Sequence, residues 1–157
     1  MERLVKFDDI DKKILNILQE NGRITNADLA SRVGLSPPPM LERVKKLEKN
    51  GVITKYVALL DPKKINKSTI IFVSVTLARH RITSIDQVKE QFSSFPEVLE
   101  CYSITGEEDY LLKVMVKDVE EYEQFMLHKL AKISAISRIK SFVVLSTIKF
   151  ETKTLVE

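Results

Sequence analysis

The chain has 157 residues, and its 25 Lys and Arg side chains nearly balance 22 Asp and Glu. A hydrophobic content of 44% is enough for one or two compact domains to form cores without disulfides. One cysteine and two histidines form neither a CxxC nor an HExxH pattern, which argues against a metal-binding or redox protein. No apolar run has the length of a signal peptide or a membrane span, so the sequence predicts a soluble, cytoplasmic protein.

The net charge of +3 comes entirely from the first part of the chain. Residues 1–60 hold 11 Lys and Arg against 8 Asp and Glu, whereas residues 61–157 hold 14 of each. Between positions 43 and 55, five cations face only Glu48, which makes a basic stripe within an otherwise balanced chain. The five cations are Arg43, Lys45, Lys46, Lys49 and Lys55.

Two short helices are predicted at the start of the chain. Asp8 can cap the first, whose apolar residues keep helical spacing until Asn21 and Gly22 stop it. Thr25 can begin the second, which is predicted to be about two turns long and to end before Gly34. A tight connection after this glycine leads into a third helical segment.

The third helix is predicted to start within residues 37–39, because prolines are tolerated in a first turn whose N–H groups have no intrahelical partner. Leu41, Val44 and Leu47 recur at helical spacing and are predicted to face the core. The basic stripe then lies on the exposed side, and residues 36–40 form a tip that can enter a DNA major groove.

Two helices joined by a short glycine-containing turn, with cations on the outer face of the second, are typical of a helix-turn-helix DNA-binding module. Arg43 can bond to a guanine edge or a phosphate, and Lys46 and Lys49 suit phosphates. An ordinary solvated helix is the alternative for an isolated charge run, but the preceding helix and turn favour DNA binding. The predicted DNA-binding residues are Thr25, Ser36, Pro37, Pro38, Met40, Arg43, Lys46 and Lys49.

The first domain, residues 1–60, is predicted to end with a strand at residues 52–59. An Asp-Pro break then opens a linker at residues 61–67, which leaves a second domain at residues 68–157. This domain begins with a strand at residues 68–78. Apolar residues lie on both faces of that strand, so both faces are predicted to contact protein.

Helical and extended segments then alternate. Ser84 begins a capping box for a helix, strands at 97–105 and 110–117 flank an acidic turn, Asp118 caps another helix, and a last strand is predicted at 139–148. The order βαββαβ is that of a ferredoxin-like domain. The predicted fold class is therefore α+β, with an N-terminal all-helical helix-turn-helix domain, winged-helix-like, before a C-terminal ferredoxin-like domain.

In a ferredoxin-like domain both helices cover one face of the sheet, so apolar residues on the other face need a different cover. A second copy of the chain, related by a twofold axis, supplies that cover because the same surface of each copy packs against the other. The sequence therefore predicts a homodimer.

The acidic turn at residues 105–110 is a candidate ligand site. Gly106 permits a positive φ and a close approach, and exposed N–H groups beside such a turn can receive a carboxylate. Asp109 can accept an ammonium group, so the turn suits both charged ends of a free amino acid. The alternative is an ordinary solvated hairpin, because Gly and Asp are common turn residues.

Several segments resemble the Lrp/AsnC family of feast/famine transcriptional regulators, and most of all its leucine-responsive members. They are DKKIL at 11–15, NGRIT at 21–25, LASRVGLS at 29–36, LERVKKLEKNGVI at 41–53, GEEDYLLK at 106–113 and SFVVLSTIK at 141–149. The resemblance covers nearly the whole chain. It implies a regulator that binds double-stranded DNA and forms dimers, which commonly assemble into tetramers or octamers.

The resemblance also implies an amino-acid effector site where dimers meet, with the acidic turn on one side and the last strand as the opposite wall. Apolar lining there would suit a Leu- or Met-like side chain. The effector-binding residues that it implies are Ile104, Gly106, Asp109, Tyr110, Leu145, Ser146 and Thr147.

No group of residues predicts catalysis. His80 and His128 lack an identifiable base or orienting partner, and Cys101 is predicted to be a buried thiol on a strand. We therefore predict a regulator that is not an enzyme and needs no metal or catalytic cofactor. Two alternatives remain: an amino-acid sensor that does not bind DNA, and a small enzyme built on the ferredoxin-like domain.

Overall fold

The computed structural model describes residues 6–78 and 85–157. The predictions made for His80 and for the capping box at Ser84 lie outside these described residues. No helix in the described ranges is long and apolar enough to cross a membrane.

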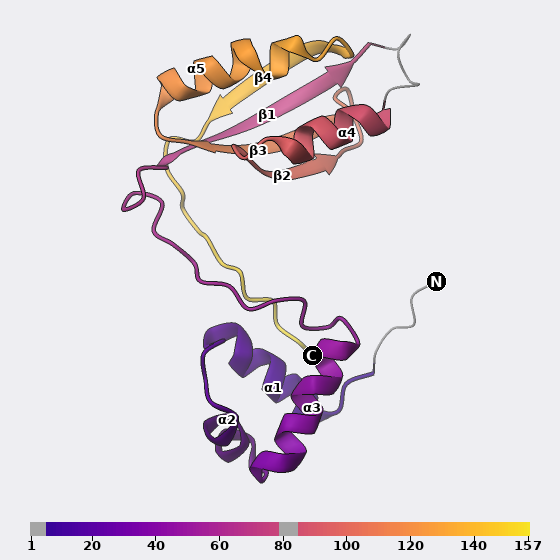
Figure 1. Cartoon of the computed structure of the whole chain (residues 1–157), viewed down its shortest axis with the longest axis vertical. Helices are drawn as coiled ribbons and strands as arrows, with labels where there is room; N and C mark the ends of the chain where they lie inside the picture. The colour runs from indigo at the N-terminus through magenta and orange to yellow at the C-terminus, as the bar shows by residue number, and fades with distance from the viewer. Residues whose placement is uncertain (1–5, 79–84) are drawn as a thin grey trace. The chain divides into compact units, whose positions relative to one another are not determined.

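The chain forms two compact units (Figure 1). The N-terminal unit contains Met1–Leu59 together with Lys149–Glu157, and the second unit contains Leu60–Ile148. The chain therefore passes from one unit to the other twice. This division differs from the predicted domain at 68–157, because residues 149–157 belong with the N-terminal unit.

Three helices build the N-terminal unit, α1 at Asp9–Glu20, α2 at Asn26–Val33 and α3 at Pro37–Lys49 (Figure 1). Their predicted starts are confirmed. Asp8 caps α1 in a capping box, in which its Oδ1 accepts a hydrogen bond from the Asp11 N–H at 2.8 Å. The buried core between the helices consists of Ile14, Leu15, Leu29, Ala30, Met40 and Leu47.

The inward face of α3 differs from the prediction. Met40 is fully buried, whereas Leu41, which was expected in the core, is 42% exposed. Met40, Val44 and Leu47 follow one another at the i, i+4 and i+7 spacing that forms one side of a helix, and α3 packs with this side inward. The prediction that Leu41 faces the core is therefore wrong.

The strand predicted at residues 52–59 is also wrong, because the structure gives these residues no strand conformation. A strand exists only through hydrogen bonds to a neighbouring strand, and the described sheet contains no strand from this segment. Val57 and Leu59 are each 64% exposed. Tyr56 donates a hydrogen bond to Glu48 at 3.1 Å, and partial burial together with this bond raises the pKa of Tyr56 to about 12.

Residues 149–157 are held against α1 by two amide side chains. Asn16 and Gln19 each exchange a pair of hydrogen bonds with the backbone of this segment, Asn16 with Val156 and Gln19 with Thr154. The side chain of Val156 is half-buried against the core of the N-terminal unit. We call Asn16 and Gln19 the α1 clamp.

The second unit has the predicted βαββαβ order and a four-stranded antiparallel sheet (Figure 1). The strands lie in the order β2-β3-β1-β4, which confirms the ferredoxin-like fold and the α+β class. A short 3-10 turn at Leu130–Lys132 follows α5. The elements are β1 at Thr69–Leu77, α4 at Ile85–Ser94, β2 at Val98–Ser103, β3 at Tyr110–Val116, α5 at Val119–His128 and β4 at Ile136–Val143.

One face of the sheet packs against both helices. Ile71, Val73 and Val75 of β1 are fully buried in a core that includes Phe92 of α4 and Phe125 of α5. Alternate residues of each strand point to the other face.

No helix of the described chain covers that other face, which we call the open sheet face. Phe72 of β1 lies directly across from Phe142 of β4 on it, and Phe142 is 54% exposed. The hydroxyl oxygens of Ser74 and Thr76 are buried there and have no hydrogen-bond partner within the described residues. The open sheet face therefore presents exposed apolar area that a second molecule could cover.

β4 ends earlier than predicted. It covers Ile136–Val143 instead of residues 139–148, because it pairs with β1 only as far as Ile71 and Val143. One further hydrogen bond joins the Val144 N–H to the Ile70 carbonyl oxygen at 2.9 Å, close to the point where β1 begins. Residues 144–148 continue without strand conformation.

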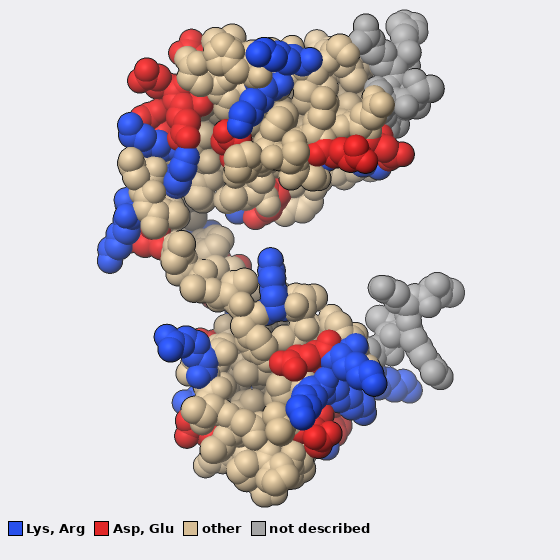
Figure 2. Space-filling model, viewed as in Figure 1, with Lys and Arg blue, Asp and Glu red and all other residues tan. Residues whose placement is uncertain are grey.

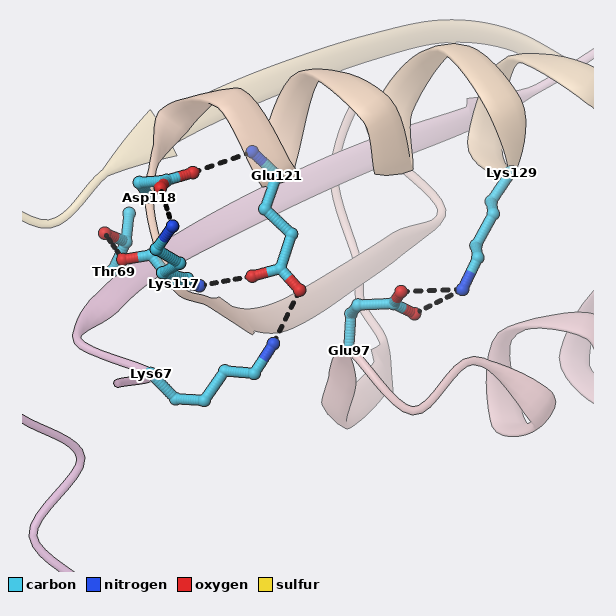
Figure 3. A network of polar contacts seen from close by, with 7 residues as sticks. All are labelled: Lys67, Thr69, Glu97, Lys117, Asp118, Glu121 and Lys129. Carbon is cyan, nitrogen blue, oxygen red and sulfur yellow. Dashed lines mark hydrogen bonds and ion pairs between the residues drawn. The ribbon is translucent and has the colours of Figure 1, made fainter. Parts of the chain in front are cut away.

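A polar network fixes the start of α5 beside the start of β1 (Figure 3). Lys67 Nζ pairs with Glu121 Oε1 at 2.6 Å, and the Lys117 N–H donates to Glu121 Oε2 at 2.5 Å. Asp118 caps α5 by accepting a hydrogen bond from the Glu121 N–H at 2.9 Å, as predicted for this residue. The hydrogen bonds from Lys67 and then Lys117 lower the pKa of Glu121.

The other end of α5 is fixed by an ion pair between Lys129 and Glu97, with N–O distances of 2.6 and 2.8 Å (Figure 3). The same ammonium group lies 5.6 Å from the ring centroid of Phe95 and 6.0 Å from that of Phe125. Both ends of α5 are thus joined to the sheet and its connections by charge-assisted contacts.

Candidate DNA interface and effector site

The corner between α2 and α3 is set by local contacts. Thr25 caps α2: its Oγ1 accepts from the Asp28 N–H at 3.1 Å and donates to Asp28 Oδ2 at 2.7 Å. Gly34 ends α2 in a left-handed conformation at φ +77°, which favours glycine. Asn26 Nδ2 donates to the Pro37 carbonyl oxygen at 2.8 Å and ties the start of α2 to the first turn of α3. The two helices are therefore held in a helix-turn-helix arrangement.

Five of the predicted DNA-binding residues are exposed on α3 or at its N-cap. Ser36, Pro37 and Pro38 are exposed at its start, and Lys46 and Lys49 are exposed near its end. In Figure 2, Lys and Arg side chains of the N-terminal unit gather on the side along which α3 runs. The surface thus has an uncharged tip beside a cationic patch, which suits a groove flanked by phosphates.

The side chains of two other predicted DNA-binding residues make contacts within the N-terminal unit. Met40 lies in the core, so the prediction that it contacts DNA is wrong. Arg43 is half-buried, and its Nη1 donates to Asp8 Oδ2 at 2.7 Å and to Asp11 Oδ1 at 2.8 Å. These two hydrogen bonds raise the pKa of Arg43, and the bond from the Asp11 N–H followed by that from Arg43 lowers the pKa of Asp8.

The acidic turn of the second unit is tied to the end of β1. Gly106 has φ +123°, a conformation that favours glycine. The Asp109 N–H donates to the Val75 carbonyl oxygen at 2.9 Å, and Asp109 Oδ2 accepts from the Leu77 N–H at 2.7 Å. The Ile104 N–H donates to the Asp109 carbonyl oxygen at 3.0 Å and closes the hairpin. Asp109 therefore organises the turn with its backbone and one carboxylate oxygen.

The two glutamates of the turn pair with cations of β4, which the sequence analysis did not identify. Glu108 Oε1 lies 2.6 Å from Lys140 Nζ, and Glu107 lies 4.0 Å from Arg138. The hydrogen bond from Lys140 lowers the pKa of Glu108. These cations stand in register with Ser74 and Thr76 of β1, so the turn is linked to the edge of the open sheet face.

The remaining predicted effector residues are placed differently. Tyr110 is 5% exposed, and its ring meets that of Phe92 edge-on at 5.6 Å, so it can contact a ligand at the turn only through its backbone. Leu145 is 97% exposed, and Ser146 and Thr147 are exposed beside it. These three residues follow β4 and do not form the predicted strand wall.

Cys101 and His128 both lie at the surface. The prediction of a buried Cys101 is wrong because β2 is an edge strand, with a neighbour on one side only. Partial burial of its thiol still raises the pKa of Cys101.

Comparison with known proteins connects both units to described domains. A family model for a winged helix-turn-helix DNA-binding domain matches residues 7–54, and the Lrp/AsnC ligand binding domain matches residues 70–154. The leucine-responsive regulatory protein of Haemophilus influenzae is 41% identical over 91% of this chain and 86% of its own length. That of Escherichia coli K12 is 37% identical over 96% of this chain and 92% of its own length.

Two solved structures have the same fold over almost their whole length. A transcriptional regulator of Neisseria meningitidis, solved as a complex with L-Met, has a TM-score of 0.90 at 38% identity and covers 94% of this chain and 95% of its own. An AsnC family regulator of Agrobacterium tumefaciens has a TM-score of 0.89 at 43% identity and covers 94% of this chain and 96% of its own.

A helix-turn-helix DNA-binding unit joined to a ligand-binding unit defines a ligand-responsive transcription regulator. With the ligand-binding domain matched over more than half of the chain and relatives at this identity, the chain belongs to the Lrp/AsnC family. It is an amino-acid-responsive DNA-binding transcription regulator.

Proposed function

We propose that α3 enters the major groove of double-stranded DNA, with Ser36, Pro37 and Pro38 at the base edges and with Lys46 and Lys49 on phosphates. The exposure of all five residues, at the N-cap of α3 and along the helix, is the observation that carries this proposal. A surplus of +3 is small for one chain. An oligomer multiplies it over several aligned helices, which supports site-specific binding over general coating of nucleic acid.

We propose that the effector is a free amino acid with a Leu- or Met-like side chain, bound at the turn that holds Gly106 and Asp109. Asp109 engages one carboxylate oxygen with the Leu77 N–H, so its other oxygen can accept an ammonium group. The Neisseria meningitidis relative solved with L-Met and the relatives named leucine-responsive support this class of ligand. Exposed Leu145 is a candidate to close over the side chain when a second dimer is present.

We infer that the open sheet face binds a second copy of the chain. Exposed Phe142, which lies directly across from Phe72 on this face, supports such a cover. Dimers would assemble further into tetramers or octamers through the effector region. An amino acid bound between dimers then changes how many DNA half-sites, about one helical turn apart, are engaged together. The chain acts in this scheme by binding and not by catalysis.

The proposal is tested by selecting bound genomic DNA fragments and titrating each of the twenty amino acids by calorimetry. We expect salt-sensitive binding to specific fragments, heat of binding for Leu or Met, and a light-scattering mass of a dimer or larger. Absence of salt-sensitive binding to any duplex would remove the DNA contact. A monomeric mass at micromolar concentration would contradict the assembly.

A further inference from the structure

The carboxylates of Asp8 and Asp11 divide their oxygens between two tasks. In the capping box of α1, Asp8 Oδ1 accepts from the Asp11 N–H at 2.8 Å, and Asp11 Oδ2 accepts from the Asp8 N–H at 3.4 Å. The remaining oxygen of each carboxylate receives Arg43 Nη1, at 2.7 and 2.8 Å. One guanidinium nitrogen of α3 thus completes the N-terminal cap of α1.

The contact is partly buried on its Asp11 side, whereas the side chain of Asp8 is 52% exposed. The side chain of Asp11 is 17% exposed and that of Arg43 is 32% exposed, less than the 59% of its neighbour Lys45. Met40, three positions before Arg43, is fully buried, and Leu47, four positions after it, is 3% exposed. Arg43 therefore projects from the side of α3 that lies next to the core.

The local charge is also unsuited to a phosphate. Arg43 contributes one positive charge and its two carboxylate partners contribute two negative charges, so the cluster has a net charge of −1. A phosphate brought to this guanidinium would meet both carboxylates at close range. Among the described residues, Arg43 and Lys45 are the cations of α3 that form ion pairs with carboxylates. Lys46 and Lys49 are therefore better suited to bind phosphates.

We propose that Arg43 is a positioning residue that fixes the recognition helix α3 against the start of α1, and that it does not contact DNA. The inference rests on the proposed entry of α3 into the major groove. Asp8 and Asp11 fix the position of Arg43, and Arg43 in turn fixes the orientation of α3. That orientation sets how residues 36–38, Lys46 and Lys49 reach the duplex. The two carboxylates therefore contribute to DNA affinity although their charge is unfavourable for it.

The test measures affinity for a selected duplex, the slope of log affinity against log salt, and the preference for that duplex over single-base variants. Asp11→Asn should lower affinity roughly five- to tenfold, although removal of a negative charge alone would raise it. Arg43→Ala should lower affinity by a similar factor and leave both the salt slope and the base preference unchanged. Combining the two substitutions should add little beyond either one, since both break the same contact.

Two matched variants show what a direct contact would do. Lys46→Ala, three positions further along α3, should reduce the salt slope by about one per subunit bound. Arg43→Lys keeps a cation that can reach both carboxylates but loses the planar fork that reads guanine, so it should recover most of the affinity without a change in base preference. Circular dichroism of each full-length variant checks folding, and Asp11→Asn with Arg43→Lys suffices if Arg43→Ala does not fold.

The proposal is overturned if Asp11→Asn raises affinity, if Arg43→Ala lowers the salt slope as Lys46→Ala does, or if Arg43→Lys relaxes base preference. Failure of the unsubstituted protein to bind any duplex is a separate result, which contradicts the DNA contact of α3 and not the cap contact of Arg43.

Discussion

Gln19 of α1 and Thr154 exchange two hydrogen bonds, with the Gln19 amide donating to the Thr154 carbonyl oxygen at 2.8 Å and accepting from the Thr154 N–H at 2.7 Å. Asn16 repeats the arrangement one turn earlier with Val156, at 3.2 and 3.3 Å. Each amide side chain binds only backbone atoms of Thr154 or Val156 in these hydrogen bonds, and not their side chains. The α1 clamp thus satisfies backbone groups of a segment that belongs to no strand of the described chain.

Removing the clamp should loosen α1. We expect Asn16→Ala combined with Gln19→Ala to destabilise the N-terminal unit by about 1–3 kcal/mol, because four hydrogen bonds are lost. Hydrogen exchange followed by mass spectrometry should show faster exchange in peptides of α1 and of residues 149–157. Gln124→Ala, which removes an exposed glutamine of α5, is the matched control. Identical exchange in the variant and the control would show that the clamp adds no stability.

The depth of Met40 can be measured directly. Met40→Ala removes a fully buried side chain and should cost about 2–5 kcal/mol in the free energy of unfolding. Leu41→Ala truncates a partly exposed neighbour and should cost less than about 1 kcal/mol. Urea unfolding followed by circular dichroism separates the two. Equal costs would mean that α3 is rotated from the orientation described above.

The network at the start of α5 should make the second unit sensitive to acid. Hydrogen bonds from Lys67 and Lys117 lower the pKa of Glu121 below its ordinary value of 4.5. Their stabilisation is therefore complete above pH 4.5 and is lost as the pH falls through the lower pKa of the folded state. The free energy of unfolding, measured between pH 6 and roughly pH 3, should fall less steeply with decreasing pH for Glu121→Gln than for the unsubstituted protein. Glu123→Gln, on an exposed position of the same helix, should keep the full pH dependence.

Gly106 should resist substitution because of its backbone and not because of crowding. An added Cβ would meet nothing within 4 Å, but φ is +123°. Gly106→Ala should therefore cost about 1–2 kcal/mol in stability and weaken amino-acid binding by distorting the turn. Calorimetry and thermal unfolding measure the two effects. Glu107→Ala is a control at the next position, where only an exposed side chain at 4.0 Å from Arg138 is lost. Unchanged stability and binding in Gly106→Ala would show that the turn relaxes freely.

The helices were predictable because their start signals are local. Asp8, Thr25 and Asp118 each accept a hydrogen bond from an N–H three residues ahead, a distance that a sequence shows directly. The ferredoxin-like order followed in the same way from the alternation of helical and extended patterns.

The errors concern contacts that local sequence does not contain. Residues 52–59 have the composition of a strand, but a strand is defined by its partner. The local sequence around Arg43 indicates a DNA contact, because its partners Asp8 and Asp11 lie 35 and 32 positions away in the chain. Met40 and Leu41 are adjacent and both apolar, so only the exact rotation of α3 decides which one is buried.

The N-terminal unit is assembled from two separate stretches of chain, which has a practical consequence for work with fragments. A fragment cut after Leu59 contains all three helices but leaves Asn16 and Gln19 of α1 without the backbone that they bind. A synthetic peptide of residues 149–157 should therefore associate with that fragment as the missing half of a split protein. Such a pair would make the DNA-binding unit accessible to study in isolation, with the peptide concentration as a control over its stability.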